Sequence, residues 1–130
     1  MILNFTVLKH VSLIKAGIKI HSMREDIHNR WKVGMGIQFS TGQRTKHYSK
    51  FMDGECLGLQ KVQMYQGSVG ILVLIDGKMI DWKETLLLAR NDGFPTAEAM
   101  MRFFVPKIPA DPSEMNEWYG KIIHWTNKKY

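Results

Sequence analysis

Two runs of β-favourable residues, 56–65 and 69–75, most strongly limit what this chain can fold into. Only Gln66-Gly67-Ser68 separates them, and Asp76-Gly77 follows as a two-residue hairpin turn into residues 78–80. An Asp-Gly pair between strand-like runs is a strong short-range signal for a hairpin. We therefore expect a meander, and any helices must pack around a sheet.

The segments before this meander predict a mixture of strands and one short helix. Residues 2–8 alternate apolar and polar side chains like a strand, and residues 11–16 fit a short helix that ends at Gly17. Glycine suits the C′ position of a helix, so residues 19–24 should form a tight, irregular connection. Residues 31–39 predict another strand, which ends in a turn at Ser40-Thr41-Gly42.

Two helices and a final strand should follow the meander. Asp81 can cap a helix that Asn91-Asp92-Gly93 ends, and Thr96 can cap a second helix that ends before Pro106. Residues 107–115 read as a connector and residues 118–126 as the last strand. This order predicts an α+β fold: a small mixed sheet or barrel with helices attached to it.

Length and composition agree with a single domain over residues 1–130. A chain of 130 residues with 45% hydrophobic residues can form one ordinary core. No apolar stretch approaches the roughly 18 residues that cross a bilayer, and the first residues do not resemble a signal peptide. Cys56 is the single cysteine, so no disulfide can form within the chain. We expect a soluble, cytoplasmic protein without a membrane partner.

Positive charge is concentrated in the first part of the chain. Residues 1–50 hold nine Lys and Arg against two acidic residues, whereas residues 51–130 sum to −1 within a total of +6. A basic region attracts polyanions, and phosphate is the group that most cellular polyanions carry. Charge alone leaves open whether this region binds nucleic acid or is only a solvated surface.

Common catalytic signatures are absent from the sequence. The chain has no phosphate-binding loop, no HExxH zinc motif, no GxSxG elbow and no GxGxxG fingerprint. Its five histidines lack the spacing of metal ligands. We therefore predict neither a metal nor a cofactor.

The segment from Gly17 to Arg24 holds the most informative polar residues. Lys19 and Ser22 would face opposite ways on a regular strand, but they can converge in a turn that follows a helix cap. A lysine in a partly dry pocket loses its proton more easily and can then activate a hydroxyl group or a water molecule. In the alternative reading, Lys19 and Arg24 bind phosphate or pair with nearby acids while Ser22 satisfies the turn.

The same segment resembles the signature of the ASCH domain, a family of PUA-like β-barrels with the pattern Gly-x-Lys-x-x-Thr-x-Arg. Here it reads Gly17, Lys19, Ser22 and Arg24, with serine in place of threonine. Two further blocks resemble later elements of the family: Arg30-Trp31-Lys32 with Gly34, and Asn91-Asp92-Gly93-Phe94 before a helix. The block from Arg44-Thr45-Lys46 through Phe51 to Cys56 and Gln60 is similar to a bacterial and phage-type branch. The resemblance implies a barrel of about five to six strands with a short N-terminal helix and two helices before the last strand.

The resemblance also implies RNA or nucleotide binding. A small bacterial branch of the family hydrolyses N(4)-acetylcytidine with a lysine, a threonine and a glutamate. By the same matching, Lys19 would be the base, Ser22 the hydroxyl and Asp92 the carboxylate, so two of the three positions differ. A displacement on the order of 1 Å in a catalytic group can cost about a hundredfold in rate, and aspartate is one methylene shorter than glutamate.

Several other side chains are candidates for ligand contact. Arg44 and Lys46, with Lys50, could hold backbone phosphate. Trp31 and Phe94, with Tyr48 and Phe51, could stack on a base, although each could equally belong to the core. We assign Cys56, Met100 and Met101 to the core.

Three functions follow, and the first is preferred. It is an RNA- or nucleotide-binding module whose basic cleft is rimmed by Lys19, Ser22, Arg24, Asp92 and Phe94. The second is a small amidohydrolase that removes an acyl group from a modified nucleoside. The third is a nuclease or a non-catalytic interaction module, the latter favoured if Lys19, Ser22 and Asp92 do not face one cavity.

Overall fold

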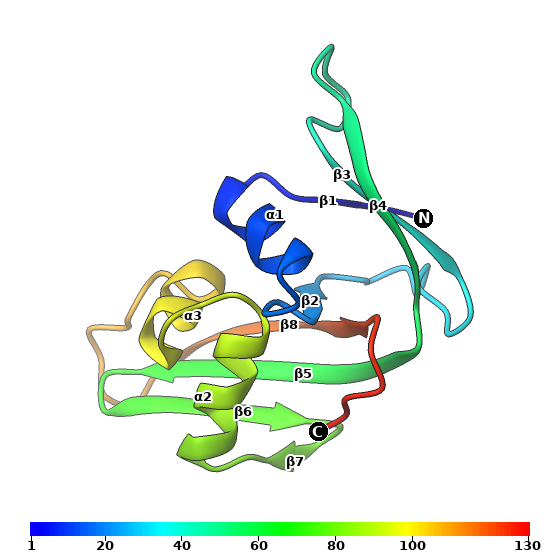
Figure 1. Cartoon of the computed structure of the whole chain (residues 1–130). Helices are drawn as coiled ribbons and strands as arrows, with labels where there is room; N and C mark the ends of the chain where they lie inside the picture. Colours follow the sequence, from blue (N-terminus) through cyan, green and yellow to red (C-terminus); the bar gives the residue numbers. More distant parts are fainter.

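The two longest strands, β5 (Gly58–Gly67) and β8 (Met115–His124), pair antiparallel along their whole length at the centre of a five-stranded sheet. The structure is a computed structural model that describes all residues from 1 to 130. Beside β5 and β8 the sheet has the order β2-β8-β5-β6-β7 (Figure 1). Its other strands are β2 (His21–Arg24), β6 (Gly70–Ile75) and β7 (Lys78–Met79).

The predicted meander is confirmed, because β5, β6 and β7 are sequential antiparallel neighbours. Asp76 and Gly77 have φ angles of 51° and 79°, the left-handed conformation that a two-residue hairpin turn of type I′ requires. Asp76 also accepts hydrogen bonds from the Lys61 backbone amide and the Gln60 side chain, so its carboxylate fixes the turn against β5.

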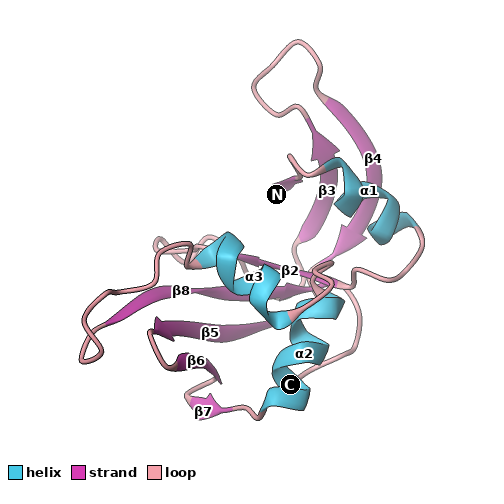
Figure 2. Cartoon of the chain, turned by 90° about the vertical axis from the view of Figure 1, so that its left-hand side faces the viewer, coloured by secondary structure: helices cyan, strands magenta, loops and turns pink.

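A second, three-stranded sheet has the order β1-β3-β4, where β1 (Ile2–Asn4) runs parallel to β3 (Gly36–Thr41). Strand β4 (Ser49–Glu55) pairs antiparallel with β3. The two strands form a long hairpin that projects from the rest of the molecule in both views (Figures 1 and 2).

The eight strands form two sheets and not one closed barrel, so the barrel prediction is not confirmed. The predicted number of five to six strands is also too low. The chain leaves β4 at Glu55 and enters β5 at Gly58, and the short link through Cys56 and Leu57 carries it from one sheet to the other. The coarser prediction of a small α+β domain is confirmed.

The second and third helices begin and end at the predicted signals, whereas the first helix ends before Gly17 as predicted but begins at Leu8, inside the segment that was predicted to be a strand. Helix α1 (Leu8–Lys15) is followed by Gly17 with φ of 75°. The Asp81 carboxylate caps α2 (Trp82–Asn91), and the Thr96 hydroxyl caps α3 (Ala97–Phe104). None of the three helices combines the length and the apolar character that crossing a membrane would need.

The core has two parts, one for each sheet. The larger part fills the space between the five-stranded sheet and helices α2 and α3, and it includes Met100 and Met101 as expected. The smaller part lies between the three-stranded sheet, α1 and the end of β8. In Figure 1, α2 and α3 cover one face of the larger sheet, and α1 lies between that sheet and the hairpin.

Several local predictions were wrong. The strand predicted over residues 2–8 ends at Asn4, and the strand predicted over residues 31–39 begins at Gly36 and continues through Thr41, where a turn was expected. Residues 19–24 are not an irregular connection throughout, because His21 to Arg24 form strand β2 and pair with Ile123 and its neighbours on β8. The pairing is long-range, and the short sequence between Gly17 and Arg24 has no strand signal of its own. Lys19 and Ile20 remain outside the strand, between the helix cap and β2.

Candidate functional site

A cavity of about 650 Å³ lies where α1, β2 and the ends of α2 and α3 meet. The sequence-predicted residues Lys19, Ser22, Arg24, Asp92 and Phe94 all line it. Further lining residues come from β1 and the segment after it, from α1, from β2 and the residue after it, from the β3–β4 loop, from α3 and the segment after it, and from β8: Asn4, Phe5, Thr6, Val7, His10, Met23, Glu25, Gln43, Phe103, Phe104, Pro106 and Trp118.

Lys19 and Asp92 form a buried ion pair at the back of this cavity. Each residue is only 2% exposed, and Lys19 Nζ lies 3.4 Å from Asp92 Oδ2. Nζ also donates a hydrogen bond to the Asp92 carbonyl oxygen. Burial lowers the pKa of Lys19 below its ordinary value, and the opposing attraction of Asp92 is the smaller effect. Lys19 therefore releases its proton more easily than a surface lysine.

Backbone contacts bring the two residues together although they lie 73 positions apart in the sequence. The Lys19 amide bonds to the Leu13 carbonyl, which keeps the residue against the end of α1. The next amide, of Ile20, donates to the Asn91 carbonyl over 2.9 Å at the end of α2. The ends of both helices thus meet at the ion pair.

Gly93 allows this close approach. Its φ is 95°, and a Cβ atom there would lie 3.0 Å from the His10 ring and 3.2 Å from the Lys19 side chain. A residue other than glycine would be strained in this conformation and would also push against two cavity residues. The Asp92-Gly93 pair therefore serves the site as well as the end of α2.

His21 and Tyr130 extend the ion pair into a directional chain of hydrogen bonds. His21 Nδ1 lies 2.9 Å from Asp92 Oδ1, and His21 Nε2 lies 2.7 Å from Tyr130 Oη. Asn91 Nδ2 donates to the same Tyr130 oxygen. Because the Asn91 amide nitrogen only donates, the Tyr130 hydroxyl donates its hydrogen bond to His21 Nε2, and the His21 Nδ1–H group donates to Asp92.

Sequence reasoning missed His21 and Tyr130. His21 stands at an unspecified position of the motif, and Tyr130 is separated from it by 109 residues. No local pattern links the two rings. They meet because β2 pairs with the end of β8, opposite His124, and the chain then returns to the end of α2.

Ser22 and Arg24 share one face of β2, since side chains two positions apart on a strand point the same way. Arg24 Nε donates to Ser22 Oγ over 3.0 Å, and Arg24 Nη2 donates to the Asn4 carbonyl over 2.8 Å. The guanidinium carbon lies 4.9 Å from the centre of the Phe5 ring. Ser22 makes no hydrogen bond with Lys19, although both residues line the cavity.

Aromatic rings form the other wall of the cavity. Phe94 contacts the His10 ring edge-on, with ring centres 5.5 Å apart, and packs against Phe103 and Phe104. Burial, followed by the charge of Lys19, lowers the pKa of His10 to about 4. His10 is therefore neutral near pH 7, and this wall is apolar beside the charged back of the cavity.

Three of the predicted contact residues do not line the cavity. Trp31 is buried in the smaller core with Phe39 and Ile123. Arg44 and Lys46 are exposed in the loop between β3 and β4. Cys56 is buried as expected, and burial raises the pKa of its thiol.

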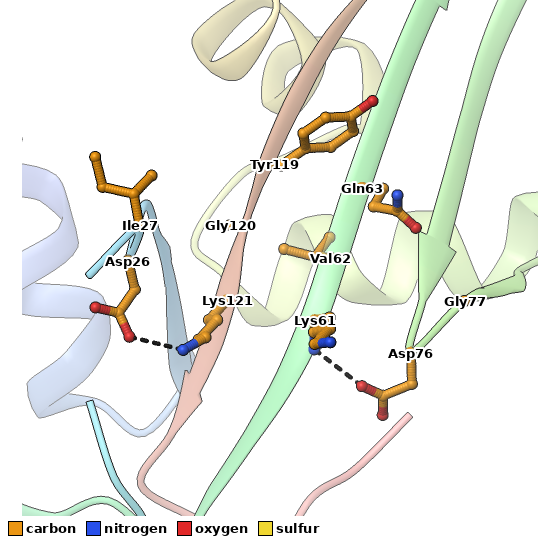
Figure 3. Close-up of a pocket in the computed structure, with 10 residues that line it drawn as sticks. All are labelled: Asp26, Ile27, Lys61, Val62, Gln63, Asp76, Gly77, Tyr119, Gly120 and Lys121. Atoms are coloured by element: carbon orange, nitrogen blue, oxygen red, sulfur yellow. Dashed lines mark hydrogen bonds and ion pairs between the residues drawn. The ribbon is translucent and has the colours of Figure 1, made fainter. Parts of the chain in front are cut away.

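A second hollow, of about 690 Å³, lies on the other side of the five-stranded sheet (Figure 3). Its charged groups satisfy one another. Lys121 Nζ lies 2.9 Å from Asp26 Oδ2, and Asp76 accepts from the Lys61 backbone amide. Figure 3 shows these pairs at the rim of an open sheet surface. This hollow lacks the buried ion pair and the aromatic wall of the first cavity.

His124 lies behind the chain of hydrogen bonds, with its ring centre 5.3 Å from that of His21. His124 is fully buried. Its Nε2 atom bonds to Gln60 Oε1 over 3.0 Å, and its Nδ1 atom has no hydrogen-bond partner. Burial and the nearby His21 and Lys129 lower the pKa of His124 to about 3. A second proton would have no acceptor in this position.

We expect the free energy of unfolding to fall as the pH is lowered from about 7 to about 4. The unfolded chain binds a proton at His124 near pH 6.5, whereas the folded chain does not until about pH 3. Stability is therefore fully present above pH 6.5 and is lost at up to about 1.4 kcal/mol per pH unit below it.

Denaturant unfolding at several pH values tests this expectation. His124→Gln keeps a donor for Gln60 but cannot titrate, so its stability should depend less steeply on pH than that of the original chain. The pKa of His10 is also lowered, so His10 makes the free energy of unfolding depend on pH in the same direction, and this contribution remains in His124→Gln. Equal slopes for the two proteins would show that His124 is protonated in the folded state.

Comparisons of the chain with family models, with curated proteins and with solved structures gave no match. The resemblance to the ASCH family therefore stays a prediction that rests on residues 17–24 and the later blocks. What the cavity can bind or transform follows from its own side chains.

Proposed function

We propose that the cavity binds a nucleobase, as part of a nucleotide or of RNA, in an ASCH-like module whose two sheets are an open form of a PUA-like barrel. One observation carries the proposal. The buried Lys19–Asp92 pair and the Arg24 guanidinium face the same cavity as the ring of Phe94.

The chemistry of a base matches this division of the cavity. A base has two apolar faces, which stack on aromatic rings, and an edge of hydrogen-bond donors and acceptors. Phe94 and the rings beside it offer contact to a face. Lys19 and Ser22 offer donors, and the Asp92 carboxylate offers an acceptor, to an edge.

Phe94→Ala should weaken the binding of cytidine about tenfold, because base–aromatic stacking is worth about 1–3 kcal/mol per base. Titration calorimetry with cytidine and with N(4)-acetylcytidine measures this change. Phe94→Leu keeps apolar volume without a ring and should lose nearly as much affinity if stacking is the cause.

Trp82→Ala is the matched control for this experiment. Trp82 is a larger ring, 72% exposed at the start of α2 and outside the cavity. Its loss should leave the affinity unchanged. If the Phe94 variants are folded, as measured by circular dichroism, and bind cytidine as tightly as the original chain does, the base does not stack on Phe94.

A second function, amide hydrolysis on an acylated nucleoside, is favoured by the lowered pKa of Lys19 inside the same cavity. Neutral Lys19 would take a proton from water or from Ser22 as its oxygen attacks the acyl carbon. The carbon–nitrogen bond then breaks, and the Lys19 ammonium returns the proton to the leaving amine. If Ser22 attacks, the acyl group stays on its oxygen as an ester, and a water molecule deprotonated by Lys19 then hydrolyses this ester to the acid and free Ser22.

The surrounding groups fit this second function in two ways. Arg24 already donates to Ser22 Oγ and can stabilise negative charge that develops on an oxygen there. Asp92 holds Lys19 in place and can accept a hydrogen bond from the amine of the substrate. With water as the attacking group, acetate and cytidine are the products of N(4)-acetylcytidine.

A further inference from the structure

The basic first part of the sequence folds into one side of the molecule. Helix α1 and the β3–β4 hairpin hold Lys9, Lys15, Arg44, Lys46 and Lys50, and they lie together above the five-stranded sheet (Figure 1). Strand β7 and the start of α2 lie at the opposite end in both views (Figures 1 and 2). Five of the nine lysines and arginines of residues 1–50 therefore lie on this side of the molecule.

The loop at the tip of the hairpin is held by its own hydrogen bonds, and it exposes the cations Arg44 and Lys46. Thr45 Oγ1 donates to the Gly42 carbonyl and accepts from the His47 amide. Gly42 has φ of 69°, and a Cβ atom there would lie 2.6 Å from the His47 carbonyl oxygen, so glycine is required. Arg44 and Lys46 have no acidic partner, whereas Lys50 pairs with Asp53 over 3.0 Å.

This loop is attached directly to the wall of the cavity. Gln43 lines the cavity, and its amide donates to Asn4 Oδ1 over 3.0 Å. The carbonyl of the same Asn4 accepts from Arg24, which in turn donates to Ser22. Arg44 thus follows a cavity residue immediately, and Asn4 fixes both the loop and the cavity arginine.

We propose that the cavity takes its base from a single-stranded polynucleotide such as RNA, whose neighbouring phosphates lie on Arg44 and Lys46. The inference rests on the nucleobase-binding function proposed above. A base can enter a buried cavity only when it is unpaired and unstacked, which a single strand allows at little expense. Two unpaired cations beside the cavity then meet the phosphates of the flanking nucleotides, and a free nucleoside has none.

The double variant Arg44→Ala/Lys46→Ala tests this arrangement with two probes, cytidine and a single-stranded oligocytidine RNA of about ten nucleotides, which is within the site size of a small binding domain. Oligonucleotide affinity should fall about tenfold or more, and its logarithmic salt slope should lose about 1.4, since each phosphate contact on a single strand contributes about 0.7. The affinity for free cytidine should not change.

Lys78→Ala/Lys83→Ala is the matched control, because it removes two exposed lysines at the far end of the molecule. It should leave both affinities and the salt slope as they are. The inference is overturned if the hairpin variant binds the oligonucleotide as tightly as the original chain does, or if both double variants lose the same affinity.

The two probes also separate this inference from the function on which it rests. If the original chain binds cytidine but the hairpin variant binds RNA normally, the cavity proposal stands and the hairpin assignment fails. If the original chain binds no cytidine and Phe94→Ala leaves RNA affinity unchanged, while the hairpin variant loses it, the cavity proposal fails, the base placement inferred here fails with it, and only the phosphate contacts of the hairpin remain.

Discussion

If the cavity hydrolyses N(4)-acetylcytidine, as the second proposed function has it, Lys19→Met is expected to abolish the release of cytidine while the chain still folds. Loss of a general base typically slows a reaction by about 10² to 10⁴, so turnover should fall at least about a hundredfold. Methionine fills the space of the lysine stem, which is buried beside Gly93 and the ring of Phe5. The assay is chromatographic detection of cytidine, with circular dichroism to confirm the fold.

Lys19→Arg distinguishes a base from a positive charge. The guanidinium keeps the charge beside Asp92 but cannot lose a proton near neutral pH. If Lys19 acts as a base, Lys19→Arg should be as inactive as Lys19→Met. If it only holds charge, the arginine variant should keep most of the turnover. Undiminished activity in Lys19→Met would remove this residue from the reaction.

Ser22→Ala then separates the two attacking groups. Ser22 makes its hydrogen bond with Arg24 and none with Lys19, which favours water as the group that Lys19 activates. If water is the attacking group, Ser22→Ala removes only one polar contact in the cavity, so its turnover should fall much less than that of Lys19→Met. With Ser22 as the nucleophile, it should fall as far as in Lys19→Met.

Local signals in the sequence were sufficient for most helices and turns of this fold. The side chains of Asp81 and Thr96 cap their helices as expected, and Asp76-Gly77 adopts its turn, because each signal acts within four residues. Strand β4 was missed for the opposite reason. Its residues 49–55 include Lys50, Asp53 and Gly54, and they form a strand only because β3 pairs with them.

In the candidate site, too, the sequence identified some residues, and only the tertiary structure revealed the others. The motif between Gly17 and Arg24 identified Lys19, Ser22 and Arg24, and the resemblance to the ASCH family identified Asp92; all four line one cavity. His21 and Tyr130 could not be found, since their contact depends on the pairing of β2 with β8 and on the path of the last residues. Trp31 was assigned to ligand contact, but apolar neighbours from the smaller core surround it.

Asp92→Ala should lower the free energy of unfolding by about 3–5 kcal/mol, the usual effect of removing one partner of a buried ion pair. In this variant Lys19 loses its charge partner, although Nζ keeps the backbone carbonyl of residue 92 as an acceptor, and the buried His21 Nδ1 loses its acceptor. Lys19 must then either stay charged without a partner or give up its proton, and each choice destabilises the fold. Urea unfolding measures the loss.

A double-mutant cycle shows whether the pair itself is the cause. Lys19→Met/Asp92→Ala removes both charges, so no buried charge is left without a partner, and replacing such a pair by apolar groups is often close to neutral. The double variant should therefore be more stable than Asp92→Ala alone, although His21 still lacks its acceptor. If the double variant instead loses the sum of the two single effects, Lys19 and Asp92 act independently, and the ion pair does not hold the back of the cavity together.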